Sequence, residues 1–526
     1  KDGSVDYFIA GNYFDEDGWR DASPSKVKQI FSKLGWQNDT SRLELSYTGA
    51  DNNMIGNGLV QEELIEQFNR KVINTSPDQT KNTLSFFNLN GSHFINDATQ
   101  LSANTYFRKS KRTTLNGDVN DDFDEAALAT WLTNNSGHDL GDYIDDECNL
   151  ASGEAEAACS GAINTSTTKQ KGYGFNAQLA FDQPIMNKQN QFIVGGGYDE
   201  SKVKFGQARE MGVVNSDRTI TGVDVPNEEA DVDLHGTSKS YNLFATDTLS
   251  LNDFVHLTVS GRYNHFNVYN KDQIEANNGT NQSLTANHSF RRFNPAMGLS
   301  FTPNKNLTVY SSYNEGMRAP TSMELGCANA DAPCRLPNSM AGDPPLEKVV
   351  SKTFEAGVRG NLSQDIKWTT AIYRTENHND IQFIAAANPT LGYFSNVGKT
   401  RRQGLDAGLA GNAGKFSWNA GYSYLKATYQ TPFELTSQGN SQAIDGEINI
   451  SKGDRLANLP SHAFKLRMQY AMTPNWTVGT NVNAFSDVYV RGNENNEHEV
   501  NTDPDHVHAN GKVAGYTVVN LDTRFK

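Results

Sequence analysis

The stretch from Val309 to Gly360 constrains the fold of this chain more than any other. Apolar and polar side chains alternate over residues 307–314 and again over 354–359. A period of two is the pattern of a strand with one apolar and one polar face. The connection between these strands, near 318–350, is far longer than a hairpin needs, whereas the next one is very short. Long loops at one end of a sheet and tight turns at the other are typical of an outer-membrane β-barrel.

The same organisation recurs along the whole chain, in alternating segments of about ten residues. Short connections lie at Gln37 to Thr40, Ser250 to Asp253, Pro303 to Asn306, Asn361 to Asp365, Gly411 to Gly414 and Thr473 to Asn475. Long ones lie near 53–80, 112–169, 206–236, 270–288, 318–350, 377–393, 431–460 and 491–513, two of them with helical segments at Val60 to Asn69 and Asp124 to Leu132. The count is about eighteen strands, the first near Val5 to Phe14 and the last near Tyr516 to Phe525. We therefore predict an all-β fold, an antiparallel transmembrane β-barrel with short periplasmic turns and long extracellular loops.

Composition agrees with this fold and excludes other classes. The mean hydropathy is −0.62, and no apolar run approaches the ~18 residues of a membrane helix; a barrel needs none, because only every second residue faces lipid. The net charge of −15 argues against nucleic-acid binding. No signal peptide is visible, and no nucleophile elbow, Walker loop, dinucleotide fingerprint or HExxH motif occurs. The sequence therefore predicts neither an enzyme nor a cofactor.

Several motifs carry a family resemblance. They are NEGMRAPTSMEL followed by DPPLEKVVSKTFEAGVRG, FIAGNYFDEDGWRDASPS near the start, NVGKTRRQGLDAGL from Asn396, GDRLANLPSHAFKLRMQY from Gly453, and GNENNEH from Gly492. Spread over nearly the whole chain and in the family's order, they resemble the barrel of TonB-dependent outer-membrane receptors. The resemblance implies a barrel of the twenty-two-stranded type, preceded by an N-terminal plug domain.

Eighteen strands are fewer than that barrel needs, and an open sheet would expose two unpaired edges to lipid. We therefore expect residues 1–526 to be a partial barrel that lacks the plug, the first hairpin and the last hairpin. The strands near Val5 and Tyr516 are then not expected to pair with each other.

The resemblance also implies a function. It is active transport of a scarce nutrient across the bacterial outer membrane by a multi-pass receptor, with a ferric siderophore as the first candidate for the nutrient. The expected partners are outer-membrane lipid and lipopolysaccharide, the TonB–ExbB–ExbD complex acting through the plug, and a small-molecule or metal-chelate cargo. The alternatives are a passive porin or adhesin-type barrel, and a receptor for cobalamin or another metal chelate.

Candidate ligand-binding residues lie near the predicted extracellular strand ends. Arg318, Arg401 and Arg402 could meet an anionic ligand such as a ferric siderophore. The alternative is that these arginines pair with loop or plug carboxylates. Tyr393 and Phe394 could stack on a chelate that is neutral or cationic.

A candidate metal site lies in the last long loop. His498, His506 and His508 occur there among several carboxylates, a combination that suits zinc, copper or nickel. His498 also belongs to the GNENNEH motif, so a structural role in the loop is the alternative.

The four cysteines form two close pairs, Cys148 with Cys159 and Cys327 with Cys334, each in a predicted long loop. Neither spacing is CxxC and neither pair has a histidine nearby, which favours disulfides in an oxidising compartment over metal ligation. Each disulfide would close a loop of about ten residues or fewer and limit its freedom by roughly 2–3 kcal/mol.

We predict that thiol titration of the purified, unreduced protein finds no free cysteine, even after unfolding. Reduction should then expose all four thiols, and a thiol detected before reduction would refute the pairing.

Overall fold

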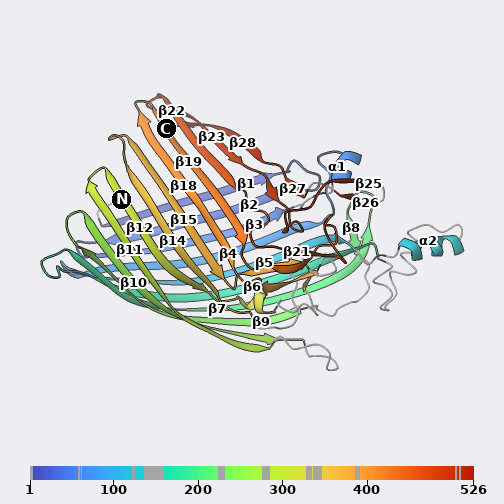
Figure 1. Cartoon of the computed structure of the whole chain (residues 1–526), viewed down its shortest axis with the longest axis horizontal. Coiled ribbons are helices and arrows are strands. Elements are labelled where there is room, and N and C mark those ends of the chain that lie inside the picture. Colours follow the sequence, from blue (N-terminus) through green and yellow to red (C-terminus); the bar gives the residue numbers. More distant parts are fainter. Residues whose placement is uncertain are drawn as a thin grey trace.

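The chain folds around one large antiparallel sheet. The computed structural model describes residues 4–56, 58, 60, 62–120, 123, 125–135, 159–222, 232–274, 285–326, 334–335, 346–385, 391–503, 506–508 and 511–526. Within them the sheet has nineteen strands. These are β1 (Val5–Glu16), β2 (Ser25–Gln37), β3 (Ser41–Ile55), β4 (Asp78–Asn96), β5 (Thr99–Val119), β6 (Gly161–Asp182), β7 (Asn190–Val214), β8 (Ile220–Gly222), β9 (Val232–Ser250), β10 (Val255–Asp272), β11 (Ala286–Asn304), β12 (Leu307–Arg318), β14 (Val349–Asn361), β15 (Ile366–His378), β18 (Thr400–Ala413), β19 (Phe416–Tyr429), β22 (His462–Thr473), β23 (Trp476–Phe485) and β28 (Tyr516–Phe525). The sheet curls until its first strands lie behind its last ones (Figure 1).

The predicted fold class is confirmed. Each long strand pairs antiparallel with the next long strand along the chain, while β8 is a three-residue addition beside β7. All six predicted short connections are turns; β2, for example, ends at Gln37 and β3 begins at Ser41. The Asn38 side chain closes this turn by accepting hydrogen bonds from the amides of Thr40 and Ser41. Such turns need few residues because consecutive antiparallel strands lie side by side.

Three strands are longer than the sequence analysis expected. Strands β5, β6 and β7 have 21, 22 and 25 residues, so parts of the predicted loops at 112–169 and 206–236 are strand. The segments 112–119 and 161–169 are rich in Thr and Asn, and 206–214 reads GQAREMGVV, so none carries a regular apolar alternation. They remain extended because each is paired along its length with a neighbouring strand, as Lys109–Val119 is with Gly161–Lys171.

The two faces of the sheet differ as the alternation predicts. Large apolar side chains are exposed on the outward face, among them Leu243, Val259 and Met297. The inward face is polar: Thr246 and Ser260 hydrogen-bond across strands at 2.7 Å, and so do Thr248 and Thr258 at 3.0 Å. This arrangement suits a wall with lipid on one side and a polar interior on the other.

The stretch from Val309 to Gly360 shows how the interior is built. On the inward face, the Tyr310 hydroxyl donates to Glu355 at 2.9 Å, and the Arg359 guanidinium lies 5.8 Å from the Tyr310 ring centroid. The Tyr310 ring covers Gly357 so closely that a Cβ there would lie 2.5 Å from a ring carbon. Glycine at this position therefore lets an aromatic ring lie flat on the neighbouring strand.

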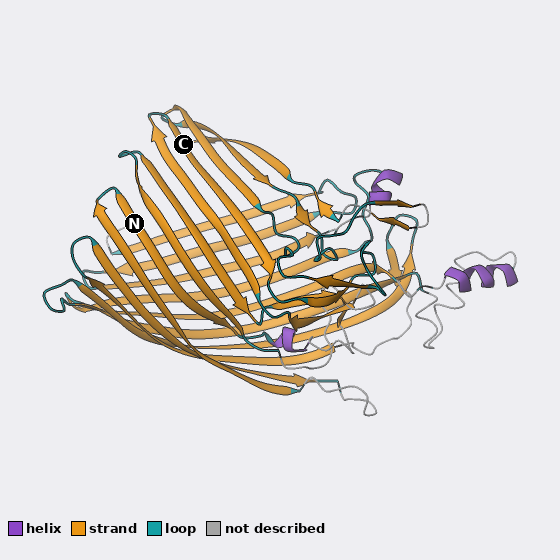
Figure 2. Ribbon diagram, in the orientation of Figure 1, coloured by secondary structure: helices purple, strands orange, loops and turns teal. Residues whose placement is uncertain are grey.

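The smaller elements gather at the end of the sheet that carries the long loops (Figure 2). They are α1 (Glu62–Gln67), α2 (Glu125–Asn134), α5 (Ser322–Gly326), β13 (Cys334–Arg335), β16 (Ile381–Ala385), β17 (Leu391–Asn396), β20 (Phe433–Thr436), β21 (Glu447–Ile450), β24 (Val488–Tyr489), β25 (Asn501–Asp503), β26 (His506–His508) and β27 (Lys512–Val513). Helices α1 and α2 lie within the two predicted helical segments, apart from a shift of about two residues at the end of α2. Among the described helices, none is long and apolar enough to cross a membrane.

The outermost strands of the sheet are β1 and β28. The pairings of the described residues join β1 to β2 and β28 to β23, and they include none between β1 and β28. All of β28 and all but one residue of β1 are exposed. That residues 1–526 are a partial barrel, without the plug and the first and last hairpins, stays a prediction.

Two of the four cysteines lie among the described residues. Cys334 is on β13, paired with Gly392 of β17, and its side chain is not described. Cys159 is disulfide-bonded and fully buried, packed with Ala162 and Met211. Its predicted partner, Cys148, lies outside the described residues, as does Cys327. Both predicted pairings therefore stay predictions.

The difference between the apolar outward face and the polar inward face predicts how the protein responds to charged substitutions. Val259→Arg places a guanidinium at the centre of the outward apolar face and should cost about 2–4 kcal/mol of folding free energy in a bilayer. The neighbouring Thr258→Arg points inward and should cost far less. Refolding into lipid vesicles measures both, and equal losses would contradict the assignment of the two faces.

Candidate functional site

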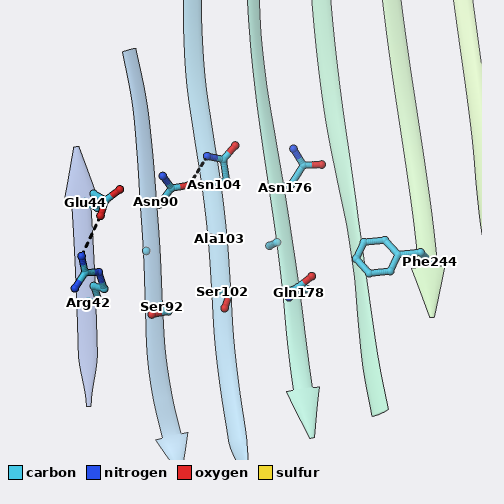
Figure 3. Close-up of a pocket in the computed structure, with 12 residues that line it drawn as sticks. Arg42, Glu44, Asn90, Ser92, Ser102, Ala103, Asn104, Asn176, Gln178 and Phe244 are labelled. Carbon is cyan, nitrogen blue, oxygen red and sulfur yellow. Dashed lines mark hydrogen bonds and ion pairs between the residues drawn. The ribbon is translucent and has the colours of Figure 1, made fainter. Parts of the chain in front are cut away.

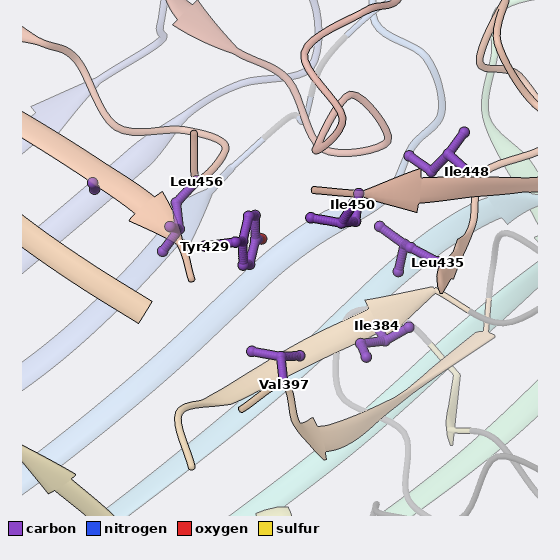
Figure 4. Close-up of a cluster of buried hydrophobic side chains, with 8 residues drawn as sticks. Ile384, Val397, Tyr429, Leu435, Ile448, Ile450 and Leu456 are labelled. Atoms are coloured by element: carbon purple, nitrogen blue, oxygen red, sulfur yellow. The ribbon is translucent and has the colours of Figure 1, made fainter. Parts of the chain in front are cut away.

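The loop between β15 and β18 and the loop between β19 and β22 pack together, with the end of β19, at the long-loop end of the sheet. The cluster consists of eight buried residues: Ile384, Val397, Ala427, Tyr429, Leu435, Ile448, Ile450 and Leu456 (Figure 4). They come from the β16–β17 hairpin and the turn after it, the end of β19, the β20–β21 hairpin and the segment before β22. Burial of these side chains holds otherwise separate loops in one arrangement, which loop backbone alone would not do.

A cavity of about 250 Å³ lies beside this cluster. Its lining combines apolar and aromatic side chains with a few polar groups: Gln382, Phe383, Ile384, Val397, Arg402, Tyr429, Phe433, Leu435, Leu456, Ala457, Asn458, Leu459, Arg491 and Glu494. The surface that faces this cavity is more polar than apolar, and charged groups converge there among aromatic and aliphatic side chains. Polar groups of this kind, held in fixed positions, set the orientation of a bound small molecule.

Two arginines supply positive charge to the cavity. Arg402 donates from both terminal nitrogens to Asp380 at 3.3 Å and to the Thr400 hydroxyl at 2.9 Å. Arg491, on a different loop, lies over the ring of Phe383 at 5.6 Å from the ring centroid. Asp380 is itself buried and holds Arg402 in position. Asp380 engages one of the two guanidinium groups, so the cavity is suited to an anionic group or to a planar aromatic one.

Glu494 lines the same cavity and is buried. Its carboxylate accepts the backbone amide of Gly492 at 2.8 Å. Burial raises the pKa of Glu494, and the hydrogen bond from Gly492 and the charge of Arg491 offset this in part. The cavity therefore contains a carboxyl group whose ionisation is disfavoured by its surroundings.

The segment Asn493 to His498 ties the loops together through hydrogen bonds. Asn493 donates to the Gly511 carbonyl at 2.8 Å, and Asn496 accepts the Arg455 amide at 2.6 Å and donates back to its carbonyl at 3.1 Å. Asn496 has φ of 63°, a conformation that asparagine adopts more readily than most residues. Carboxamides suit this work because each offers both donors and an acceptor.

The structure separates the three arginines predicted to bind ligand. Adjacent residues on a strand point to opposite faces, so Arg402 points inward while Arg401 points outward and donates to Glu376 at 2.8 and 3.0 Å. Arg318 donates to both oxygens of Glu324 at 2.7 and 2.9 Å. All three arginines pair with carboxylates of this chain; Glu324 and Asp380 lie in loops, as the alternative considered from the sequence expected, and Glu376 lies on strand β15. Their role in ligand binding stays a prediction. Of the three, Arg402 lines the cavity.

The two predicted aromatic residues lie on β17 and are half-buried. Tyr393 packs against the loop cluster, and Phe394 contacts the Phe383 ring edge-on with centroids 5.1 Å apart. Phe394 also packs on buried residues beneath it, among them Phe205 and Val268. Both rings therefore have packing partners within the protein.

The predicted metal ligands can be traced in part. His498 accepts the backbone amide of Ser441 at Nδ1, at 2.9 Å, which links two loops and fits the structural alternative. His506 and His508 lie on β26, and their side chains are not among those described. Within the part of the chain that the structure describes, no group of three His, Cys, Asp or Glu side chains could hold a metal ion.

A second cavity, of about 380 Å³, lies on the inward face of β3 to β6 and β9 (Figure 3). Arg42 and Glu44 stand at one side, 3.1 Å apart, and Phe244 at the other. Between them Asn104 donates to Asn90 at 2.7 Å, beside further amide and hydroxyl side chains. This wall offers hydrogen bonds but little net charge.

Sequence reasoning missed Arg491, Glu494 and Asp380. The GNENNEH motif pointed to the segment that contains Glu494, but nothing in the sequence places it beside β16 and β18. Only loop packing brings these residues to one cavity.

The raised pKa of Glu494 predicts a pH-dependent loop. A buried carboxyl whose folded pKa is raised contributes stability that is present at low pH and is lost as pH rises through that pKa. Amide exchange over residues 492–498, corrected for its intrinsic pH dependence, should therefore slow as pH falls. Burial also raises the pKa of Asp454 in this loop region, with the same sign.

Glu494→Gln should flatten the pH dependence of this exchange while keeping the shape of the side chain. Glu499→Gln, an exposed change in the same loop, is the control. A pH dependence that persists unchanged in Glu494→Gln would contradict the assignment.

Comparison with known proteins places the fold. A family model described as TonB dependent receptor-like, beta-barrel, matches residues 7–526. No curated protein matches the chain. Among solved structures, the ferric citrate transporter FecA in its unliganded form aligns with a TM-score of 0.70 at 13% identity, covering 99% of this chain and 66% of that one.

Two further structures align similarly. The ferric-catecholate import receptor Fiu from E. coli K12, in its closed form, gives a TM-score of 0.68, and the siderophore receptor PiuA from Acinetobacter baumannii gives 0.67. Each is 16% identical and aligns with 99% of this chain and 71% of its own. At these identities the likeness shows the fold alone, and the chain spans about two thirds of the length of these relatives. The family match over residues 7–526 shows that the chain belongs to the TonB-dependent receptor β-barrel family, whose members are outer-membrane transport receptors and not enzymes.

Proposed function

We propose that this chain forms the barrel of an energy-coupled receptor that takes up a ferric siderophore through the outer membrane. The observation that carries the proposal is the loop cavity beside Arg402 and Arg491, lined with aromatic rings, at the end of the sheet that bears the long loops. The solved structures that align with the chain are named as transporters or receptors of ferric citrate, ferric catecholates and siderophores, which supports this class of cargo.

Electrostatics favours an anionic chelate at this cavity. The chain carries a net charge of −15, so the overall field repels anions, and a local pair of guanidinium groups is needed to hold one. Phe383, Tyr429 and Phe433 add aromatic surface against which the organic part of a chelate can pack.

Coupling to energy follows from the family and forms part of the proposal. The TonB–ExbB–ExbD complex would act from the periplasm through a plug domain, and the amide-lined inward wall of β3 to β6 offers hydrogen bonds to such a polar occupant. Outer-membrane lipid and lipopolysaccharide would surround the outward face.

Arginine substitutions test the cargo site. Arg491→Ala removes a guanidinium from the cavity, and Arg402→Ala removes the other but leaves the buried Asp380 without this partner. A hydrogen bond to a charged group is worth about 1.5–3 kcal/mol, so each change should weaken binding of an anionic ferric chelate roughly tenfold to a hundredfold. Arg401→Ala, whose side chain points outward, is the matched control and should change binding little.

The assay is titration of the intact receptor with ferric citrate, a ferric catecholate, a neutral ferric chelate and cobalamin. Equal loss in Arg401→Ala and Arg491→Ala would place the site elsewhere. Binding of cobalamin without any ferric chelate would replace the siderophore with another cargo. Uptake that continues without an energised inner membrane would favour the passive porin.

A further inference from the structure

The outward faces of β5, β6 and β7 carry six lysines in a compact grid. Cross-strand pairing sets Lys109 opposite Lys171, which is opposite Lys202; one row further out, Lys111 is opposite Lys169, which is opposite Lys204. All six are exposed. They share the outward face with Phe107, Tyr173 and Val194, which lie on the same strands at positions of the same parity.

The grid is small in extent. Neighbouring strands lie about 4.8 Å apart and residues two apart on a strand about 6.8 Å. Six positively charged side chains therefore project from the outward face of the sheet within an area of roughly 10 Å by 7 Å. Like charges directly opposite one another on a sheet repel and destabilise the pairing.

Within the described residues, one carboxylate, that of Glu200, forms an ion pair with a lysine of this grid. Glu200 lies 3.2 Å from the Lys202 ammonium and 3.9 Å from that of Lys239, and it accepts the Tyr198 hydroxyl at 2.6 Å. None of the other five lysines forms an ion pair with a described carboxylate. Among the described residues, five of the six lysines therefore have no ion-pair partner, on a chain whose net charge is −15.

A row of aromatic side chains places the grid relative to the membrane. On the side toward the short turns, the rings of Tyr173 and Tyr198 lie 6.4 Å apart, those of Tyr198 and Tyr241 5.0 Å, and those of Tyr241 and His265 6.3 Å. Aromatic belts of this kind mark the boundary between hydrocarbon and headgroups in a barrel. The lysines follow directly beyond the belt, toward the long loops.

From the start of β5 at Thr99 to Phe107 is nine residues, and a tilted strand crosses the hydrocarbon core in about 9–11. Lys109 and Lys111 therefore leave the wall at the depth of the outer-leaflet headgroups. We propose that this grid, Lys109, Lys111, Lys169, Lys171, Lys202 and Lys204, binds the phosphate groups of phosphorylated lipids of the outer leaflet, lipopolysaccharide among them.

The chemistry fits phosphate better than cargo. Lysine ammonium groups bind phosphate as point charges and need no fixed geometry, and the aliphatic stems can lie along the apolar wall below. On the inward face, the positions between the two rows of lysines, Ser110, Gln170 and Val203, are uncharged, whereas Arg108 and Arg112 flank them on β5. All six lysines are on the outward face, so their charge faces the lipid and not the transport path. This inference rests on the outer-membrane position of the barrel and is independent of the cargo.

The test uses the full chain reconstituted in phosphatidylcholine vesicles with or without lipid A. Two triple variants, K109Q/K171Q/K202Q and K111Q/K169Q/K204Q, each remove three charges from the grid. The matched control, K188Q/K305Q/K415Q, removes three exposed lysines at the short-turn end of the barrel. Native mass spectrometry counts bound lipid A, and thermal unfolding reports stability.

Each lysine close to an anionic membrane surface strengthens binding roughly fivefold, so each grid variant, which loses three of them, should bind lipid A roughly a hundredfold more weakly. Lipid A should raise the melting temperature of the wild type and the control, but much less that of the grid variants. In phosphatidylcholine alone the grid variants should be at least as stable as the wild type, because like-charge repulsion is relieved.

Unchanged lipid A binding in both grid variants would overturn the proposal, as would an equal loss in the control, which would indicate a bulk charge effect. Inorganic phosphate that competes fully at the same concentration as lipid A would also overturn it, since that would mark a site for free anions. If Arg491→Ala loses chelate binding but still binds lipid A, the lipid site is independent of the cargo site, as proposed.

Discussion

The antiparallel ladder of backbone hydrogen bonds is the constraint on which the rest of this structure depends. In hydrocarbon every amide and carbonyl must find a partner within the protein, and a sheet supplies one only when each strand has neighbours on both sides. Consecutive strands from β2 to β23 meet this condition through nearest-neighbour pairing. That pairing needs only tight turns at one end, which leaves the loops at the other end free to grow.

The ladder has a second consequence, because it sends neighbouring side chains to opposite sides of the wall. Arg401 and Arg402 are adjacent in sequence, yet one shares Glu376 with Arg374 and Lys399 on the outward face, and the other lines a cavity. In β5 to β7 the same alternation puts the six lysines of the grid on the outward face and Ser110, Gln170 and Val203, which lie between their two rows, on the inward face. A single wall can thus present one chemistry to lipid and another to its interior.

The loops beyond the end of the sheet are held together by other interactions. Their backbone is not organised by the main sheet, so order comes from a buried apolar cluster and from side chains that bond to distant backbone. Asn440 and Ser437 both donate to the Gly492 carbonyl at 2.8 Å, and His498 accepts from Ser441. These contacts assemble a cavity whose lining is local to the loops and can differ between family members while the barrel stays the same.

The sequence by itself determined the parts that follow from local periodicity and turn chemistry. These are the antiparallel sheet, its eighteen long strands, all six predicted turns and the faces of inward charges such as Glu355 and Arg359. Only the tertiary structure decided the outer halves of β5 to β7, since polar residues extend there because a neighbouring strand pairs with them. It also decided the cavity, where Phe383 and Arg491 from two loops meet Arg402 near the start of strand β18. The lysine grid likewise depends on register, because the offset between strands that turns scattered lysines into one patch is set by pairing across the sheet.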